Sequence, residues 1–218
     1  MRFFKNRTVN WKYIFGEVFL IFIGINLAIW FNDWNTSKTV QKDKEIALVK
    51  IKEEINNNLQ ELERTRAHNQ KVPLFYKGLE GIKNQNEEVR VSPEKMRAFV
   101  TEYSEFFINV DSIPLGNGLY EYEGDTFVNI EITDLSSIAW EISKSTGIFH
   151  EFGYDCLYDL QGLYNLQDLV KNELTKATEA LRDNSIEDLV RVMGFMDQLE
   201  EQLIAQYTRM IDNIDNCK

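Results

Sequence analysis

The side chains best suited to chemistry are few and lie apart in the sequence. His150, Glu151 and Asp155 come closest to a polar cluster, yet His150 and Asp155 do not share one face of a helix. A histidine-based zinc site needs two histidines at short spacing, and the other histidine, His68, is far away. We therefore expect His150 to be a hydrogen-bonded or exposed histidine rather than part of a site.

Other catalytic signatures are missing from the sequence. It has no Gly-x-Ser-x-Gly elbow, no phosphate-binding loop and no dinucleotide fingerprint, and "PLGNG" lacks the lysine and following helix that a phosphate loop needs. The two cysteines match no zinc, iron–sulfur or redox spacing. The sequence predicts no catalytic residue, metal or cofactor, and we expect a protein that is not an enzyme.

The charge is unevenly distributed. The chain of 218 residues has 24 Lys and Arg against 35 Asp and Glu, a net charge of −11. Its first twelve residues hold no acid and four bases, Arg2, Lys5, Arg7 and Lys12. The rest is strongly acidic, which argues against a nucleic-acid partner, because phosphate contacts need a basic face.

The most informative stretch is the apolar run from Tyr13 to Phe31, whose only charge is Glu17. As a helix it would be about 28 Å long, close to the thickness of a bilayer's hydrocarbon layer. Its apolar residues cover all sides, which disfavours a core helix with a single buried stripe. Aromatic residues flank both ends, as at two membrane–water interfaces: Trp11 and Tyr13 at one, and Trp30, Phe31 and Trp34 at the other.

A cleaved secretory signal is the alternative interpretation of this run. The region after its core reads "AIWFNDWNTS", where the bulky Trp30 breaks any small-x-small cleavage pattern. We therefore expect an uncleaved anchor. Residues 1–12 would be a cytoplasmic basic tail, 13–34 a transmembrane helix and 35–218 a domain on the other side, since positive flanks stay in the cytoplasm.

Glu17 lies about one turn inside the cytoplasmic edge of the anchor. Gly24 and Ala28 form a small-x-x-x-small pair that permits close helix approach. The alternatives left open are an acid that reaches Lys12 or the interface, and a proton path. The predicted transmembrane packing seam, with Glu17 hydrogen-bonded to a second helix, comprises Glu17, Ile21, Gly24, Ala28 and Asn32.

The segment "GEVFLIFIGINLAIWFNDWN" resembles the opening of an uncharacterised family of bacterial single-pass membrane proteins common in Bacteroidota. The family pattern falls on Gly16, Glu17, Gly24, Ile25, Asn32, Trp34 and Asn35. "SSIAWEISKSTGIFHEF" is similar to its second recurring region. The resemblance implies an anchor with a helical domain outside, which we expect in a bacterial inner membrane with a periplasmic C-terminal domain. It implies no activity and no site residues.

In three long stretches beyond the anchor, apolar residues recur at alternating intervals of four and three residues. The first, Lys38–Asn69, predicts a stem helix of about 50 Å, into which the anchor can continue. The other two flank "RDNS", where Ser185 and Asp188 form a cap pattern, and predict a helical hairpin. The fold class we expect is all-α: a transmembrane helix followed by an extracytoplasmic bundle with one long irregular loop. Asn58, on the first stretch, is interpreted as lying at the bundle margin.

Shorter elements connect these rods. A break at Val72-Pro73 precedes a short helix from Leu74 to Ile82, and "NQNEEVRV" predicts a polar turn. Ser92-Pro93 opens the next helix. Thr133 or Asp134 caps a later one, which Gly147 ends.

The stretch "INVDSIPLGNGLYEYEGDTFVNIEIT" interrupts the helical pattern. It holds Pro114 and three glycines, and predicts a long loop, with one short β-hairpin as an alternative. An ordinary connector is the other interpretation of this loop. Its aromatic and acidic residues form the candidate recognition loop: Tyr120, Glu121, Tyr122, Glu123 and Asp125.

Cys156 and Cys217 fall at nearly the same level at the open end of the predicted hairpin. A disulfide is an alternative there, but we favour two reduced cysteines, one in the core and one in the tail. An aromatic set, Trp140, Tyr154, Tyr158 and Tyr164, is interpreted as plain core rather than a ligand cavity.

These features favour a membrane-anchored binding or assembly protein that presents a helical bundle to a partner or ligand. The partners we expect are the lipid bilayer and either another protein or a second copy of this chain. The alternative is an accessory subunit of a transport or secretion complex, packed through the anchor. An enzyme is the third hypothesis, and no motif supports it.

Overall fold

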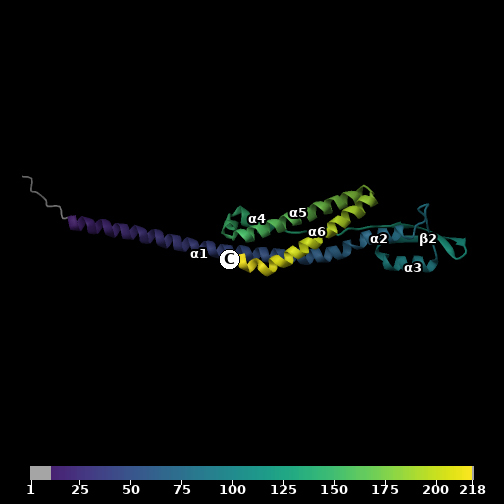
Figure 1. Ribbon diagram of the computed structural model, residues 1–218, viewed down its shortest axis with the longest axis horizontal. Coiled ribbons are helices and arrows are strands. Elements are labelled where there is room, and N and C mark those ends of the chain that lie inside the picture. Colours follow the sequence, from purple (N-terminus) through teal and green to yellow (C-terminus); the bar gives the residue numbers. More distant parts are fainter. Residues whose placement is uncertain (1–10, 218) are drawn as a thin grey trace, which may run out of the picture.

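The computed structural model describes residues 11–217 and shows a long rod with a helical bundle along half of it (Figure 1). Helix α1 runs unbroken from Trp11 to Asn69, so the expected anchor and stem form one helix of about 88 Å. Its first half stands clear of the other elements, whereas its second half is one side of the bundle (Figure 1). The predicted basic tail, residues 1–12, lies outside the described residues except for its last two.

The predicted helical hairpin is confirmed. Helices α5 (Tyr154–Arg182) and α6 (Ile186–Asn213) pack against each other, and α6 also packs on α1. Asn184 takes a positive φ of 53° in the turn, which asparagine tolerates. The Ser185 hydroxyl donates to Asp188 at 2.7 Å but accepts no backbone N–H, so the predicted cap is only half correct.

Four of the shorter helix predictions can be compared with the structure. Helix α2 (Lys71–Glu80) starts earlier than expected, because Pro73 falls in its first turn, where a missing N–H costs nothing. Ser92 does cap α3 (Pro93–Glu102), and accepts from the Lys95 N–H at 3.4 Å. Helix α4 (Ile138–Ser145) begins four residues or more after the predicted cap, while Gly147, at φ 77°, follows its end as expected.

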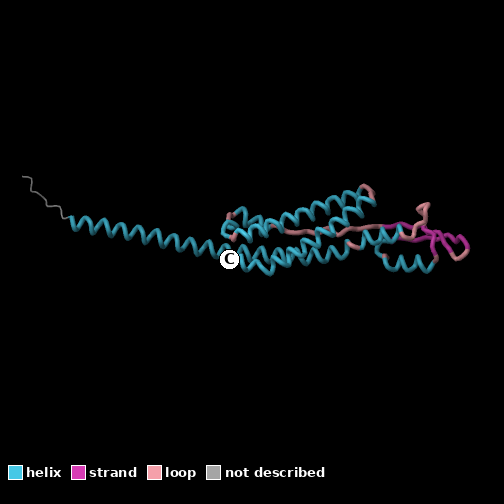
Figure 2. Tube along the Cα trace, viewed as in Figure 1, coloured by secondary structure: helices cyan, strands magenta, loops and turns pink. Residues whose placement is uncertain are grey.

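A three-stranded antiparallel sheet corrects the all-α prediction. Strands β1 (Val89–Val91), β2 (Phe107–Gly116) and β3 (Leu119–Thr126) pair in the order β1-β3-β2. The expected loop is therefore mostly a hairpin, and the expected polar turn runs into β1. Asn117 and Gly118 both have positive φ between β2 and β3, as the Asn-Gly hairpin turn requires. The sheet lies at the opposite end of the molecule from the free half of α1 (Figures 1 and 2).

Cys156 and Cys217 form a disulfide with their Cα atoms 5.5 Å apart, so the interpretation as two reduced cysteines is wrong. Short 3-10 helix η3 (Ile214–Cys217) follows α6 and brings Cys217 back toward the first turn of α5. The bond closes a loop with a sequence separation of 61 at the open end of the hairpin. A disulfide of this kind typically stabilises a fold by about 2–4 kcal/mol.

The core consists of two apolar clusters that follow one another along the rod. One joins α1, α4, α5 and α6 around Ile51, Ile55 and Leu203, and the other joins α2, α3, the sheet and the far ends of α5 and α6 around Phe75 and Phe106. On α1, the buried polar residues Thr65 and Asn69 fall in sequence between Leu62 of the first cluster and Val72 of the second.

Residues 127–137, here called the strap, lack regular secondary structure but are held by side chains of α1. The strap leads from the sheet back to α4 beside the helices (Figure 2). The Asn69 side chain donates to the Glu131 carbonyl and accepts from the Glu131 N–H, both at 2.9 Å. Asn58 binds Ser136 in the same two-sided way, at 2.7 and 2.9 Å.

The two asparagine contacts, here called the amide clamps, are equally far apart on helix α1 and on the strap. Asn58 and Asn69 are eleven residues apart, about 16.5 Å along a helix. Glu131 and Ser136 are five residues apart, which is also about 16.5 Å along an extended chain. Between the clamps, the hydroxyls of Thr65 and Thr133 lie 2.7 Å apart. One face of α1 thus supplies the hydrogen bonds that a lone extended segment would lack.

Helices α5 and α6 also contribute to the clamp between Asn58 and Ser136. Gln167 of α5 donates to the Leu135 and Ser136 carbonyls at 3.2 and 3.1 Å, and its carbonyl accepts from the Tyr207 hydroxyl of α6 at 2.6 Å. Asn58 is only 2% exposed, so its interpretation as a margin residue is wrong. Its amide sits where three helices meet the strap.

Replacing Asn58 tests this arrangement. Asn58→Ala should lower the free energy of unfolding by about 2–4 kcal/mol, because it leaves buried backbone groups of Ser136 without partners. Asn57→Ala, at the exposed neighbouring position, should change it by less than about 0.5 kcal/mol. Denaturation of the purified full chain in mild detergent measures both, and equal losses would contradict the clamp.

Candidate functional site

The predicted transmembrane seam lies on an open face of α1. Glu17, Ile21, Gly24, Ala28 and Asn32 are all exposed. A Cβ added at Gly24 would meet no atom within 4 Å, so no described part of this chain covers that position. The seam residues share a face as expected, and no helix among residues 11–217 packs on them.

The apolar half of α1 has the properties of a membrane span. Among residues 11–217, one helical stretch near the N-terminus is long and apolar enough to cross a bilayer. Its best 18 residues have a mean hydropathy of 2.1 and none is buried, unlike the core helix of a soluble protein. At its end, the Lys38 ammonium lies 3.8 Å from the centre of the Trp34 ring.

The predicted recognition residues all lie on β3, the central strand, and so alternate between its two faces. Tyr120 and Tyr122 are half-buried, and Tyr122 packs against the second apolar cluster. Glu121, Glu123 and Asp125 share the outer face. The structure therefore divides these five residues between core packing and an acidic surface.

The outer face of the sheet gathers more charge than β3 alone supplies. Asp111 of β2 lies directly opposite Glu123. Asn109 holds Asp125 with two hydrogen bonds of 2.8 and 3.0 Å, and Arg90 of β1 pairs with Glu121 at 2.9 Å. Like charges on opposite positions destabilise a sheet, so the Asp111–Glu123 pair is costly for the isolated molecule.

Strand β2 is an edge strand of ten residues, whereas the sequence predicted a long loop or a short hairpin there. Its outer backbone groups have no neighbouring strand among residues 11–217. Ile108 is 67% and Ile113 56% exposed on this strand. A long edge with exposed apolar side chains is a ready template for another strand. The alternation in "FINVDSIPLG" before Asn-Gly was the available sequence signal.

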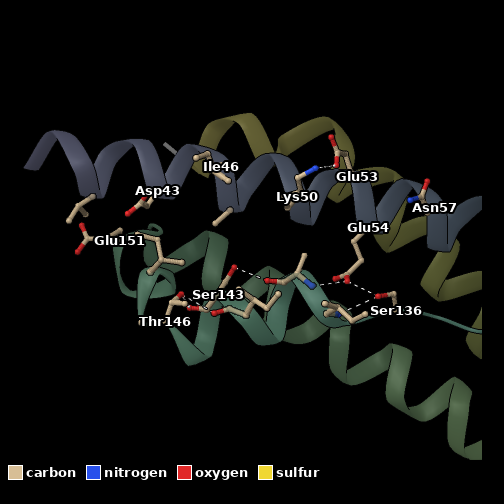
Figure 3. A pocket seen from close by; sticks show the side chains of 17 residues that line it. Asp43, Ile46, Lys50, Glu53, Glu54, Asn57, Ser136, Ser143, Thr146 and Glu151 are labelled. Atoms are coloured by element: carbon tan, nitrogen blue, oxygen red, sulfur yellow. Dashed lines mark hydrogen bonds and ion pairs between the residues drawn. The ribbon is translucent and has the colours of Figure 1, made fainter.

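A groove of about 730 Å³ lies between α1 and the segment formed by α4 and the 3-10 helix η2 (Ile148–Glu151), as Figure 3 shows. It is at the end of the bundle nearer the apolar half of α1 (Figure 1). Residues between Val40 and Asn57 form one wall, and Ser136 to Glu151 form the other. The apolar lining includes Ile46, Ala47, Ile138, Ala139, Ile142 and Ile148.

Glu54 forms part of this groove and ties its two walls together. Its carboxylate accepts from the Ser136 hydroxyl and the Ala139 N–H, each at 2.8 Å, and so caps the start of α4 (Figure 3). It also accepts from the Tyr164 hydroxyl at 2.7 Å. Burial, helped by this bond, raises the pKa of Tyr164 far above its usual range, so the phenol remains a donor. With three donors bound, Glu54 holds the groove together rather than offering a free base.

The remaining sequence candidates do not converge on a site. Trp140 and Tyr164 are buried and stack with centroids 5.4 Å apart, while Tyr154 and Tyr158 are exposed, so the aromatic set is core only in part. Glu151 lines the groove, whereas Asp155 lies beside the disulfide. Within residues 11–217, no group of His, Cys, Asp and Glu could hold a metal ion.

A buried carboxyl lies deeper in the bundle. Glu200 is 2% exposed and lies 4.0 Å from Arg66, whose guanidinium bonds instead to Asp197 at 2.8 Å. Burial raises the pKa of Glu200 to about 7, and Arg66 offsets this only partly. The group thus titrates near neutral pH, but it lines only a small hollow of about 310 Å³.

Comparison with protein-family models, curated proteins and solved structures gives no match for this chain. The resemblance of its first forty residues to a family of bacterial single-pass proteins therefore stays a prediction. Three surfaces of the described chain are candidates for contact with other molecules: the apolar helix face, the groove and the sheet edge.

The raised pKa of Glu200 predicts how the stability of the protein depends on pH. Between its ordinary pKa of 4.5 and about 7, the folded protein keeps a proton that the unfolded chain releases, so stability falls as pH rises through this range. Glu200→Gln should therefore stabilise the protein by about 1–3 kcal/mol at pH 8 and by little at pH 4.5. Denaturation at both pH values measures this difference.

The matched control is Glu201→Gln, because the Glu201 side chain is 76% exposed. It should change stability equally little at both pH values. If the gain from Glu200→Gln were the same at pH 4.5 and pH 8, the pKa of Glu200 would not be raised.

Proposed function

We propose that this protein is a membrane-anchored binding protein that presents a helical bundle, with a β-sheet at its far end, to a partner outside the cytoplasm. One observation carries the proposal: the exposed apolar helix and the open-edged sheet lie at opposite ends of one continuous rod (Figure 1). Such a shape separates the place of attachment from the place of contact.

Three features support the anchor and its orientation. The apolar stretch has no cover from the rest of the described chain, as expected for a surface that faces lipid. Helix α1 continues unbroken past Trp34, so a signal-type cleavage would fall within a regular helix. The Cys156–Cys217 disulfide is typical of an oxidising compartment, which supports a bundle on the outer side of a bacterial inner membrane.

The length of the rod supports a protein partner. Residues 35–69 of α1 extend about 52 Å beyond the anchor, and α2 adds about 15 Å in the same direction. Packing of α6 along α1 stiffens this part. The sheet is then held far above the lipid headgroups, where another protein is the available partner.

The chemistry of the sheet supports an extended, basic partner segment. The free edge of β2 can add a strand through backbone hydrogen bonds, and Ile108 and Ile113 can contact its apolar side chains. Basic residues on the added strand would relieve the repulsion between Asp111 and Glu123. Because Ile113 lies on the same face of the sheet as Asp111, the expected partner offers a strand that carries both a Lys or Arg and an apolar residue on that face.

A photo-crosslinking amino acid at Ile113 tests this function in intact membranes. It should form an adduct with a second protein, and Asp111→Lys should reduce that adduct severalfold by removing charge complementarity. The same amino acid at Leu169, exposed on α5 far from the sheet, is the control. Adducts of equal yield at both positions, or none at Ile113, would contradict the proposal.

An accessory subunit of a larger membrane complex is the second candidate function. The open seam on α1, with its uncovered Gly24, favours it. Glu17→Leu should then release the chain from a complex larger than two copies, as native gel electrophoresis would show. Phe19→Leu, on the opposite face of α1, should leave the complex intact. An unchanged complex in Glu17→Leu would argue against this candidate.

A further inference from the structure

We infer that the groove between α1 and α4 receives helix α1 of a second copy of this chain, so that two copies form a parallel two-fold dimer. This inference rests on the proposed function, because a shared membrane holds two α1 helices side by side in the same direction. The inferred partner is a second copy of this chain.

Both walls of the groove carry apolar side chains that nothing in the described chain covers. Ile46, which lines the groove, is 49% exposed on α1, and Val49, about one turn further along the helix and just outside the groove, is 54% exposed. The opposite face of the same helix is buried in the bundle by Leu48 and Ile51. Across the groove, Ile138 is 68% and Ile142 56% exposed. In a two-fold pair, Ile46 and Val49 of each copy can cover the groove of the other.

The groove continues the line of the transmembrane seam. At 100° per residue, Ile46 and Val49 project within about 60° of Gly24 and Ala28 on the same straight helix. A helix that packs on Gly24 and Ala28 therefore reaches the groove with little bending. The small residues in the membrane and the apolar residues above it form one continuous face.

The charges beside this face suit a parallel pair. If Ile46 and Val49 form the core of the helix pair, Glu45 and Lys50 flank that core. In a parallel pair, a residue at the position of Glu45 lies beside the partner residue five positions later in sequence, which is Lys50. Glu45 of one copy then faces Lys50 of the other, twice. Both side chains are exposed, and the Lys50 bond to Glu53 at 2.6 Å is a surface pair that leaves Lys50 accessible.

A lipid chain fits the groove less well. Val40, the groove residue nearest the anchor, lies six residues beyond Trp34, about 9 Å from the interface. The walls also carry Asp43, Lys50 and Glu53, charges of both signs that a second helix can match. A lipid in the groove is therefore an outcome that the experiment must be able to reveal.

Crosslinking of the full chain in native membranes tests the dimer. The native cysteines are paired, so a short bismaleimide reacts only with an introduced thiol. Val49→Cys should give a covalent dimer, whereas Gln41→Cys, exposed on another face of α1, should give far less. Equal yields at both positions, adducts with a different protein, or no adduct in Val49→Cys would each overturn the inference.

Charge exchange in the Val49→Cys background supplies the specific test. Glu45→Lys or Lys50→Glu alone should lower the dimer yield, by about tenfold in the dimer association constant. The two changes together should restore it, which excludes misfolding as the cause. No effect of either single change would overturn the inference, as would a loss that the double change does not repair. If no dimer is crosslinked while the adduct at Ile113 still forms, the dimer inference is overturned and the proposed function is not.

Discussion

Two asparagine side chains on α1 hold the strap by its backbone, and the positions of the groove and of the sheet edge depend on that contact. The clamps at Glu131 and Ser136 fix where the strap starts and ends along the helix. Successive residues of an extended chain face opposite sides, so a slip of one residue would turn Val128, Ile130 and Leu135 out of the core. The clamps thus set the register between the sheet at one end of the strap and α4 at the other.

The sheet and the groove are the two ends of this one connection. Beyond Ser136, the strap delivers Ala139 to the carboxylate of Glu54, which caps α4 and creates the second wall of the groove. In the other direction, the strap continues directly from β3. Because α1 is the common support, its apolar half, the groove and the sheet edge keep fixed positions along one rod, and the disulfide secures the end of the α5–α6 hairpin.

Helices with strong periodicity could be predicted from sequence, whereas contacts between distant segments could not. The hairpin of α5 and α6 follows from the local spacing of apolar residues. Asn58, in contrast, binds Ser136, which is 78 residues away, and the sequence around Asn58 does not indicate that partner. The groove was missed for the same reason, since its walls come from residues near 50 and near 140. Spacing put Cys156 and Cys217 at nearly the same level, but the short 3-10 helix η3, which carries Cys217, was not predicted. The residues of the predicted recognition loop lie on a strand, and only a strand explains why Tyr122 packs inward while Glu123 faces out.

Amide hydrogen exchange in the strap tests the central claim most directly. The N–H groups of Glu131 and Ser136 bond to side chains of α1, not to any strand, and the account predicts that they exchange as slowly as the N–H of Ile55 in the core of α1. Measured on the full chain in lipid nanodiscs, exchange as fast as at Gly118 in the hairpin turn would contradict it. The strap would then be an ordinary loop that fixes neither the groove nor the sheet.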